Sequence, residues 1–198
     1  MTEDGLHRLE HARFDDVYVR PDIDLRGYDQ LLIGDVELTY REHPRPHRRY
    51  VSSQQQAFLL SDDSLESLRT LSRDTVVEEL SQGDGWKIVD APAPNALRLD
   101  IALTDMVVNV PEQMLTGPAN SVRVFVKRSG AATLVVELHD SQSGTLLARF
   151  SERGEVKIGA EIVYESTAPT NREYTRVLLV RWARTLHRSL DELRATTL

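Results

Sequence analysis

The chain of 198 residues contains no cysteine. Disulfide bonds, thiolate catalysis and cysteine-ligated metal sites are therefore excluded. No apolar run reaches the roughly 18–20 residues that a membrane-spanning helix needs. Residues 1–14 also lack the apolar stretch of a secretory signal. The sequence as given predicts neither a transmembrane segment nor an export signal.

Sequence motifs of the common enzyme classes are missing as well. G-x-S-x-G, H-E-x-x-H, G-x-G-x-x-G and G-x-x-x-x-G-K-[ST] do not occur. Basic residues are in the minority, since 24 lysines and arginines stand against 31 acidic residues, for a net charge of −7. A nucleic-acid binder is expected to have a basic surface. We therefore expect no enzymatic activity, no cofactor and no nucleic-acid partner.

The composition that remains is that of a globular protein. Apolar residues make up 40% of the chain and charged residues 28%, which is enough to bury a core. The length is typical of a single domain over residues 1–198. Residues 1–16 are polar and without periodicity, and we expect them to be a flexible N-terminal segment.

The clearest structural signal is a β-hairpin over residues 133–155. Every second residue is apolar before and after a central turn, as in half-buried strands. A three-residue loop over residues 142–144 puts both apolar sets on one face and sets Glu137 opposite Arg149. Gly144 then occupies the position with positive φ, which glycine adopts without a Cβ clash. In this register, Leu138 faces Ala148 and Val136 faces Phe150.

Further periodic segments complete the prediction of the fold. Alternation predicts strands over residues 17–19, 31–40, 86–89, 96–110 and 122–127. The apolar phase changes at Asp105, which indicates a β-bulge. Helical spacing predicts helices over residues 61–82 and 171–194, the first capped by Ser61 or Asp62. Pro169 is expected just before the second helix, with Thr170 or Asn171 as its cap.

These elements do not alternate as βαβα. The predicted fold class is α+β, with a single mixed, largely antiparallel β-sheet and two long helices packed on one face. Trp182 and Tyr174 lie on the apolar stripe of the second helix, where we expect core anchors rather than ligand-stacking residues. Gly83-Asp84-Gly85 follows a helix, which is the wrong context for a phosphate loop, and predicts a plain turn.

Two groups of residues resemble catalytic sets. His139, Asp140 and Ser141 have the residue types of a hydrolase triad, but neighbours in a strand point to opposite faces. We expect Asp140 to stabilise the turn and His139 to be exposed. Asp100 and Asp105 lie on one strand, about 16 Å apart at roughly 3.3 Å per residue, which is too far for an acid/base pair. We expect Asp105 to bond backbone groups at the bulge.

The segment 41–50, REHPRPHRRY, is the one basic stretch in an acidic chain, with four arginines against Glu42. His43 and His47 could hold a metal beside Glu42, but Pro44 and Pro46 keep them off a helical face. We therefore expect no metal site.

The simplest interpretation of this segment is a solvated hairpin loop. The alternative is an anion-facing patch that contacts lipid headgroups, cell-wall polymers or an acidic partner. The residues that would make these contacts are Arg45, His47, Arg48 and Arg49.

Several segments together resemble one protein family. They are residues 14–38, 96–106 and 132–150, followed by the tryptophan-bearing segment 181–193. In order and spacing they are similar to the DUF3313 family, bacterial envelope proteins of unknown function that are commonly lipoproteins. The resemblance implies a periplasmic or outer-membrane-associated protein, often anchored through a lipidated N-terminal cysteine. It supplies no catalytic residues, and this chain departs from the pattern because it has neither the cysteine nor a signal.

We therefore expect a non-catalytic cell-envelope accessory or protein-interaction domain, whose partner is an envelope protein or an anionic surface. An alternative is a binding module for a small apolar or lipid ligand held between helix and sheet. A third is a hydrolase with an unrecognised site. The shape of the surface separates them. A deep apolar cavity favours the ligand binder, a flat surface the interaction domain, and a cleft of histidines and carboxylates the enzyme.

Overall fold

The computed structural model describes residues 2–41, 58–83, 85–110, 112, 115, 123–159 and 162–195. Within these residues, none of the helices combines the length and hydropathy of a membrane span. The basic segment 42–50 and Asp84 lie outside the described residues.

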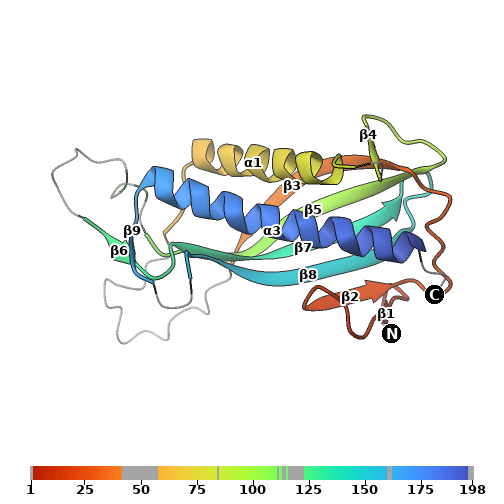
Figure 1. Ribbon diagram of the computed structural model, residues 1–198, viewed down its shortest axis with the longest axis horizontal. Coiled ribbons are helices and arrows are strands. Elements are labelled where there is room, and N and C mark those ends of the chain that lie inside the picture. The colour runs from red at the N-terminus through yellow and green to blue at the C-terminus, as the bar shows by residue number, and fades with distance from the viewer. Residues whose placement is uncertain are drawn as a thin grey trace.

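A seven-stranded sheet and two long helices make up most of the described structure. Strands run in the spatial order β1 (His7–Arg8), β2 (Asp16–Val19), β8 (Leu146–Val156), β7 (Gly130–Asp140), β5 (Ala96–Val108), β3 (Gln30–Tyr40) and β4 (Lys87–Val89). Neighbouring strands pair antiparallel, except that β3 runs parallel to both β5 and β4. A small antiparallel pair, β6 (Phe125–Val126) and β9 (Tyr164–Glu165), lies beyond one end of the sheet (Figure 1).

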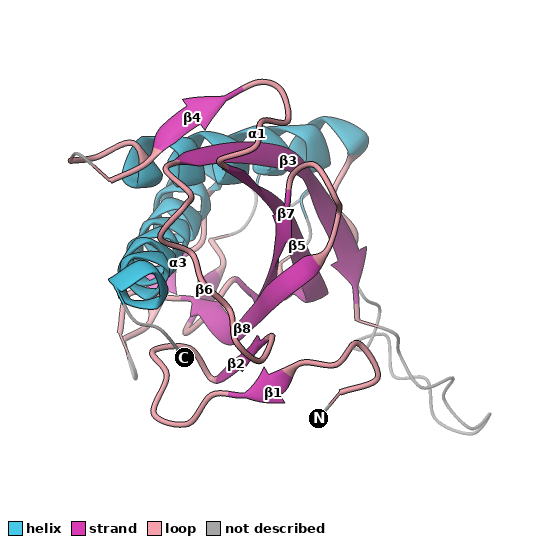
Figure 2. Cartoon of the chain, turned by 90° about the vertical axis from the view of Figure 1, so that its right-hand side faces the viewer, coloured by secondary structure: helices cyan, strands magenta, loops and turns pink. Residues whose placement is uncertain are grey.

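Helices α1 (Asp62–Leu80) and α3 (Ala168–Ala195) lie side by side on one face of the sheet, as both views show (Figures 1 and 2). The predicted α+β class, with a mixed sheet covered on one face by two helices, is confirmed. Because β3, α1 and β4 follow one another and β3 pairs parallel with β4, the chain also contains one βαβ unit.

The hairpin has the predicted register. Val136 lies opposite Phe150, and Leu138 lies opposite Ala148. Gly144 has a φ of +69°. On the outer face, Arg149 Nε donates to Glu137 Oε1 at 2.8 Å.

The bulge on β5 is also where the sequence predicts it. Asp105 has a φ of +50°, and the pairing with β7 shifts between Thr104 and Val107. It is the backbone carbonyl of Asp105 that accepts a hydrogen bond there, from Arg153 Nη1 at 2.9 Å. The bulge turns Met106 toward the helices, where it is buried.

The second helix begins earlier than the sequence predicts. It starts at Ala168, and Thr167 is the cap, since its Oγ1 accepts from the Thr170 N–H at 3.3 Å. Pro169 therefore lies inside the first turn, where a missing N–H costs no intrahelical hydrogen bond. The first helix is capped by Ser61, as expected, through a bond from the Ser64 N–H.

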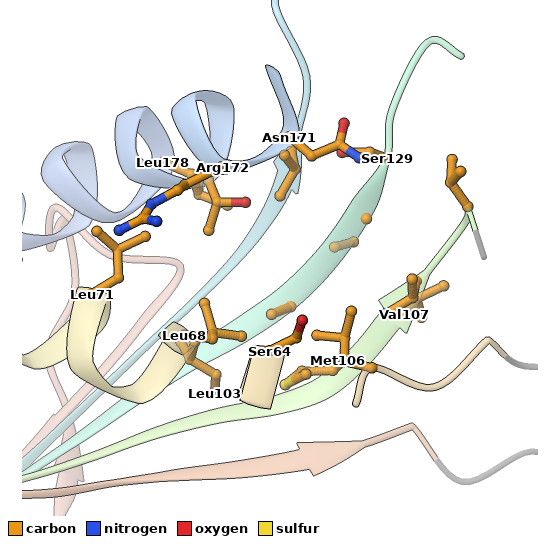
Figure 3. Close-up of a pocket in the computed structure, with 18 of the residues that line it drawn as sticks. Ser64, Leu68, Leu71, Leu103, Met106, Val107, Ser129, Asn171, Arg172 and Leu178 are labelled. Atoms are coloured by element: carbon orange, nitrogen blue, oxygen red, sulfur yellow. The ribbon is translucent and has the colours of Figure 1, made fainter. Parts of the chain in front are cut away.

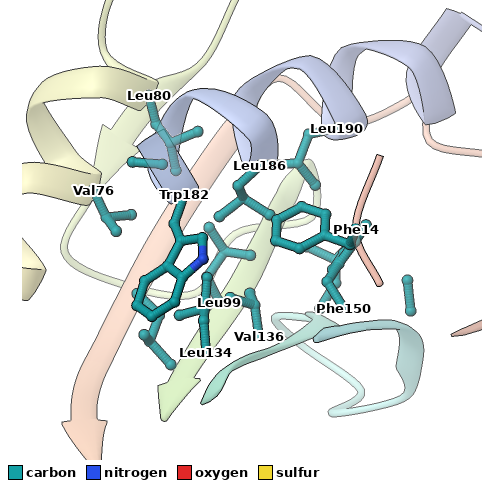
Figure 4. Packing of buried hydrophobic residues seen from close by; sticks show 14 of the residues in the cluster. Phe14, Val76, Leu80, Leu99, Leu134, Val136, Phe150, Trp182, Leu186 and Leu190 are labelled. Atoms are coloured by element: carbon teal, nitrogen blue, oxygen red, sulfur yellow. The ribbon is translucent and has the colours of Figure 1, made fainter. Parts of the chain in front are cut away.

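The core fills the space between the helices and the inner face of the sheet (Figure 4). Trp182 reaches down from α3 onto the sheet and is 2% exposed, so its predicted role as a core anchor is confirmed. Tyr174 is half-buried and packs edge-on against Tyr164, with ring centroids 4.8 Å apart.

The N-terminal residues differ from the expected flexible segment. Strand β1 pairs with β2, and β2 pairs with β8. Leu6 is fully buried, and the ring of Phe14 lies 5.5 Å from that of Phe150. Residues 2–16 are thus part of the folded structure, where strand pairing and the burial of Leu6 and Phe14 stabilise them.

Candidate functional site

A cavity of about 350 Å³ lies between the two helices and the sheet, at the end of the molecule where both helices begin (Figure 3). In the second half of α1, Val76 and Leu80 are buried against the core. In the first half, Leu68 and Leu71 line the cavity and are only half-buried. The apolar stripe of α1 therefore continues past the point where the core ends.

The cavity exists because one strand offers only small side chains there. Residues 130, 132 and 134 share the inner face of β7, and they are Gly130, Ala132 and Leu134. Where Leu134 fills the core, Ala132 and Gly130 leave space between the sheet and α3. The remaining walls are largely apolar, formed by Leu60, Leu68, Leu71, Leu103, Met106, Val156, Leu178 and Trp182.

The carboxylate of Glu112 is a polar group in the lining of this cavity. It accepts hydrogen bonds from the Ser64 hydroxyl at 2.6 Å, the Ser61 N–H at 2.7 Å and the Ser61 hydroxyl at 3.0 Å. These hydrogen bonds hold the pKa of Glu112 below its ordinary value, and the bond from the Ser64 hydroxyl contributes most. Glu112 is thus an anion attached to the N-terminal end of α1, where the helix dipole favours negative charge.

A cation from the other helix lies in the same lining. Arg172, on the first turns of α3, extends its guanidinium over the cavity toward Leu71 of α1 (Figure 3). Within the described ranges, no carboxylate forms an ion pair with Arg172. The cavity therefore combines largely apolar walls with a guanidinium at its rim that has no carboxylate partner in the described part of the chain.

The residues proposed from the sequence as an anion or partner contact are not placed. Arg45, His47, Arg48 and Arg49 lie outside the described residues, so this patch stays a prediction. The described residues contain no group of three or more histidines and carboxylates that could hold a metal ion.

The residues that resemble a triad have separate partners. Asp140 accepts from the backbone N–H groups of Ser143 at 2.6 Å and Gln142 at 3.2 Å, so its predicted role in the turn is confirmed. The hydroxyl of Ser141 donates to the carbonyl of Ala93 at 2.9 Å. These three side chains do not converge on one point.

The prediction that His139 is exposed is wrong, because the side chain is buried. Its Nδ1 lies 3.2 Å from the carbonyl oxygen of Gly144, and its Nε2 lies 3.4 Å from carboxylate oxygens of both Asp100 and Glu137. The ring thus lies beside charged side chains of β5 and of its own strand β7, on the face of the sheet opposite the two described helices. Asp100 is further held by Arg98 at 2.8 Å.

The sequence analysis offers a ligand held between helix and sheet as an alternative, but it identifies none of the residues that line the cavity. The half-buried leucines of α1 have the same spacing as core residues, so periodicity does not separate them. The signal that could have located the cavity is the run Gly130-Ala131-Ala132, at the start of an otherwise bulky strand. Small residues on the inner face predict either close packing or a space.

Comparison with known proteins identifies the family. The family model described as "Protein of unknown function (DUF3313)" matches residues 2–186, and the chain belongs to this family. No curated protein matches the sequence. Similar solved structures include the PelC dodecamer from Paraburkholderia phytofirmans (12% identity, TM-score 0.40, covering 85% of this chain and 96% of that chain). Another is the hypothetical protein CT253 from Chlamydia trachomatis (8% identity, TM-score 0.42, covering 85% of this chain and 99% of that chain).

Proposed function

We propose that this member of the DUF3313 family is a non-catalytic binding module of the cell envelope. In this proposal, it takes a small apolar ligand, or the acyl part of a lipid, into the cavity between its helices and its sheet. The envelope location is supported by the family resemblance. The ligand is supported by one observation, the largely apolar cavity of about 350 Å³.

The volume and the lining favour an apolar occupant. Small-molecule sites are concave, mostly apolar and usually about 300–1,000 Å³ in volume. An apolar cavity of roughly 150 Å³ already admits benzene, so the cavity here, at about 350 Å³, has room for a larger apolar group. Burial of apolar surface contributes about 25 cal/mol per Å², which makes such an occupant favourable without a specific polar contact.

The expected accessory or interaction role is compatible with this proposal. A protein that binds an apolar molecule can act as its carrier or as a domain whose partner binding depends on it. A largely apolar cavity favours the ligand-binding role, whereas a flat surface would favour the interaction role. We therefore place ligand binding first and the interaction role through the basic segment second.

The test is binding of an uncharged fluorophore, N-phenyl-1-naphthylamine, whose emission rises in apolar surroundings. We expect saturable binding to the wild-type chain and displacement by dodecanol. Ala132→Leu, which fills the cavity from the inner face of β7, should abolish binding. Ala102→Leu is the matched control, because Ala102 lies half-buried on the outer face of β5.

Both variants are first compared with the wild type by circular dichroism and thermal unfolding. Binding that is lost only in the Ala132→Leu variant supports the proposal. A wild-type chain that does not bind the fluorophore, or two variants that bind it equally, would contradict it.

A further inference from the structure

The polar group of the ligand can be inferred from the rim of the cavity, an inference that rests on the proposed function. We infer that the ligand is a single-chain amphiphile with an anionic head group, bound by the guanidinium of Arg172 while its apolar tail occupies the cavity.

The cavity runs from a polar rim to an apolar interior along α3. Arg172, Leu178 and Trp182 all line it. At about 1.5 Å per residue, Trp182 lies roughly 15 Å further along the helix axis than Arg172. Of these residues, Arg172 is exposed, whereas Leu178 and Trp182 are buried. This gradient fits a molecule with one polar end and one apolar end.

Several other arginines of α3 form ion pairs within the protein. Arg176 pairs with Glu173, Arg181 with Glu152, and Arg184 with Glu79. Arg172 has no carboxylate partner among the described residues, and the first turn of α3 contains no acidic residue. A guanidinium offers a planar set of donors that matches a carboxylate or a phosphate group. Arg172 is therefore available for an anion at the rim.

An anionic head group could also bind at the N-terminal end of α1, but the carboxylate of Glu112 already occupies that position. It already accepts hydrogen bonds from the Ser61 and Ser64 side chains, and its pKa is held below the ordinary value, so it is charged at neutral pH. An anionic head is repelled there and is attracted to Arg172 on the opposite helix. A cationic amphiphile would show the reverse preference, which makes the sign of the head group measurable.

The experiment compares amphiphiles that share a dodecyl tail and differ only in the head group. We measure how well each of four compounds displaces the uncharged fluorophore from the wild-type chain, at low salt and below its micelle concentration. The compounds are dodecanoate, dodecyl phosphate, dodecanol and dodecylamine. We expect the two anions to bind roughly tenfold more tightly than dodecanol, since a charge-assisted hydrogen bond adds to the burial of the same tail. The affinities of dodecanoate and dodecyl phosphate then show whether the site prefers a carboxylate or a phosphate head group.

Two variants test whether Arg172 is the contact. Arg172→Gln should reduce the affinity for the anions to that for dodecanol and leave dodecanol unchanged. Arg188→Gln is the matched control, because Arg188 is an exposed arginine on the same helix outside the cavity lining, and it should keep the preference.

Failure of this inference can be told apart from failure of the proposed function. If dodecanol does not displace the fluorophore, the cavity does not bind apolar ligands and both proposals are wrong. If dodecanol binds but the anions bind no better, or if dodecylamine binds most tightly, the anionic head group is refuted while the apolar site stands. An anion preference that survives in Arg172→Gln refutes the role of this residue.

Discussion

Gly154 on β8 lies directly against the indole ring of Trp182 on α3. A Cβ atom on this glycine would come within 2.5 Å of indole Cζ2 and 2.7 Å of Leu178 Cδ1. Real Cβ atoms do not approach other atoms so closely, so the missing side chain is what allows the helix to rest on the sheet here. The contact also sets the inner end of the cavity, because Leu178 and Trp182 both line it.

The first prediction follows from this contact. Gly154→Ala should lower the free energy of unfolding by about 1–3 kcal/mol, because an added methyl group forces α3 away from the sheet. Urea denaturation measures the change. Gly27→Ala is the control, since a Cβ there meets nothing within 4 Å, and should change stability by less than about 0.5 kcal/mol. Equal midpoints for the two variants would show that the helix is not held at this distance.

A second prediction concerns the turn of the hairpin. Gly144 has a φ of +69°, and a Cβ there would meet no atom within 4 Å. The cost of Gly144→Val is therefore backbone strain alone, on the order of 1–3 kcal/mol. Gly144→Asn should cost less, because asparagine adopts positive φ more readily than a β-branched residue. Thermal unfolding of both variants measures the difference. Equal stability of the valine and asparagine variants would show that backbone strain at this position does not set the cost.

A third prediction is a loss of stability at alkaline pH. Tyr28 donates to Asp140 Oδ2 at 2.8 Å. Burial, together with this hydrogen bond, raises the pKa of Tyr28 from 10.0 to about 12. The folded state therefore holds the phenol proton more tightly than the unfolded state. This contribution is complete below pH 10.0 and is lost as the pH rises toward about 12.

Tyr28→Phe should remove this part of the pH dependence and cost about 1 kcal/mol at neutral pH, for the lost hydrogen bond. Urea denaturation of both proteins across the alkaline range gives the difference, in which the other tyrosines cancel. Parallel curves for the two proteins would mean that Tyr28 is not linked to unfolding.

A fourth prediction concerns the basic segment, which is known here only from its sequence. Three arginines near an anionic surface contribute about 1 kcal/mol each, enough for weak and salt-sensitive binding. Wild-type chain should sediment with anionic liposomes at low salt and less so at physiological salt. Alanine at Arg45, Arg48 and Arg49 should abolish this sedimentation.

A control variant removes the same net charge elsewhere. It carries alanine at Arg69, Arg73 and Arg188, on the two helices. If wild type and both variants sediment equally, the segment is only a solvated loop. If the control loses binding as well, the effect reflects net charge rather than this segment.

The sequence predicts the hairpin in detail because side chains alternate between the two faces of a strand, which limits the possible registers. Only every second register places Val136 and Phe150 on the same face, and a three-residue loop selects the one observed. Glycine is the residue that adopts the positive φ at position 144 at least cost. The bulge at Asp105 is readable for the same reason, since a phase change in an alternating strand has few causes. These features are local, and side-chain periodicity reports them directly.

The cavity and the burial of His139 are not readable in this way. Periodicity tells which residues share a face but not how far the opposite layer stands from them, so Leu68 and Leu71 look like core residues. Beside His139 lie Glu137 of the same strand and Asp100 of β5, and the pairing with β5 joins residues far apart in the sequence. The position of Arg172 at the cavity is not readable either, because an exposed arginine on a helix carries no signal until its neighbours are known.

The pairing of β2 with β8 has a consequence for the order of folding. Arg20, just after β2, donates to the carbonyl of Leu146, which is 126 residues further along the chain. The β7–β8 hairpin closes a short loop, whereas the contact between Arg20 and Leu146 closes one of 126 residues, and loop closure costs more entropy as the loop lengthens. Strand β2, which is synthesised well before β8, is thus among the last to pair. Until β8 exists, the apolar side chains of Leu6 and Phe14 have no sheet to cover, so an interrupted or slowly emerging chain exposes them to aggregation and to chaperones.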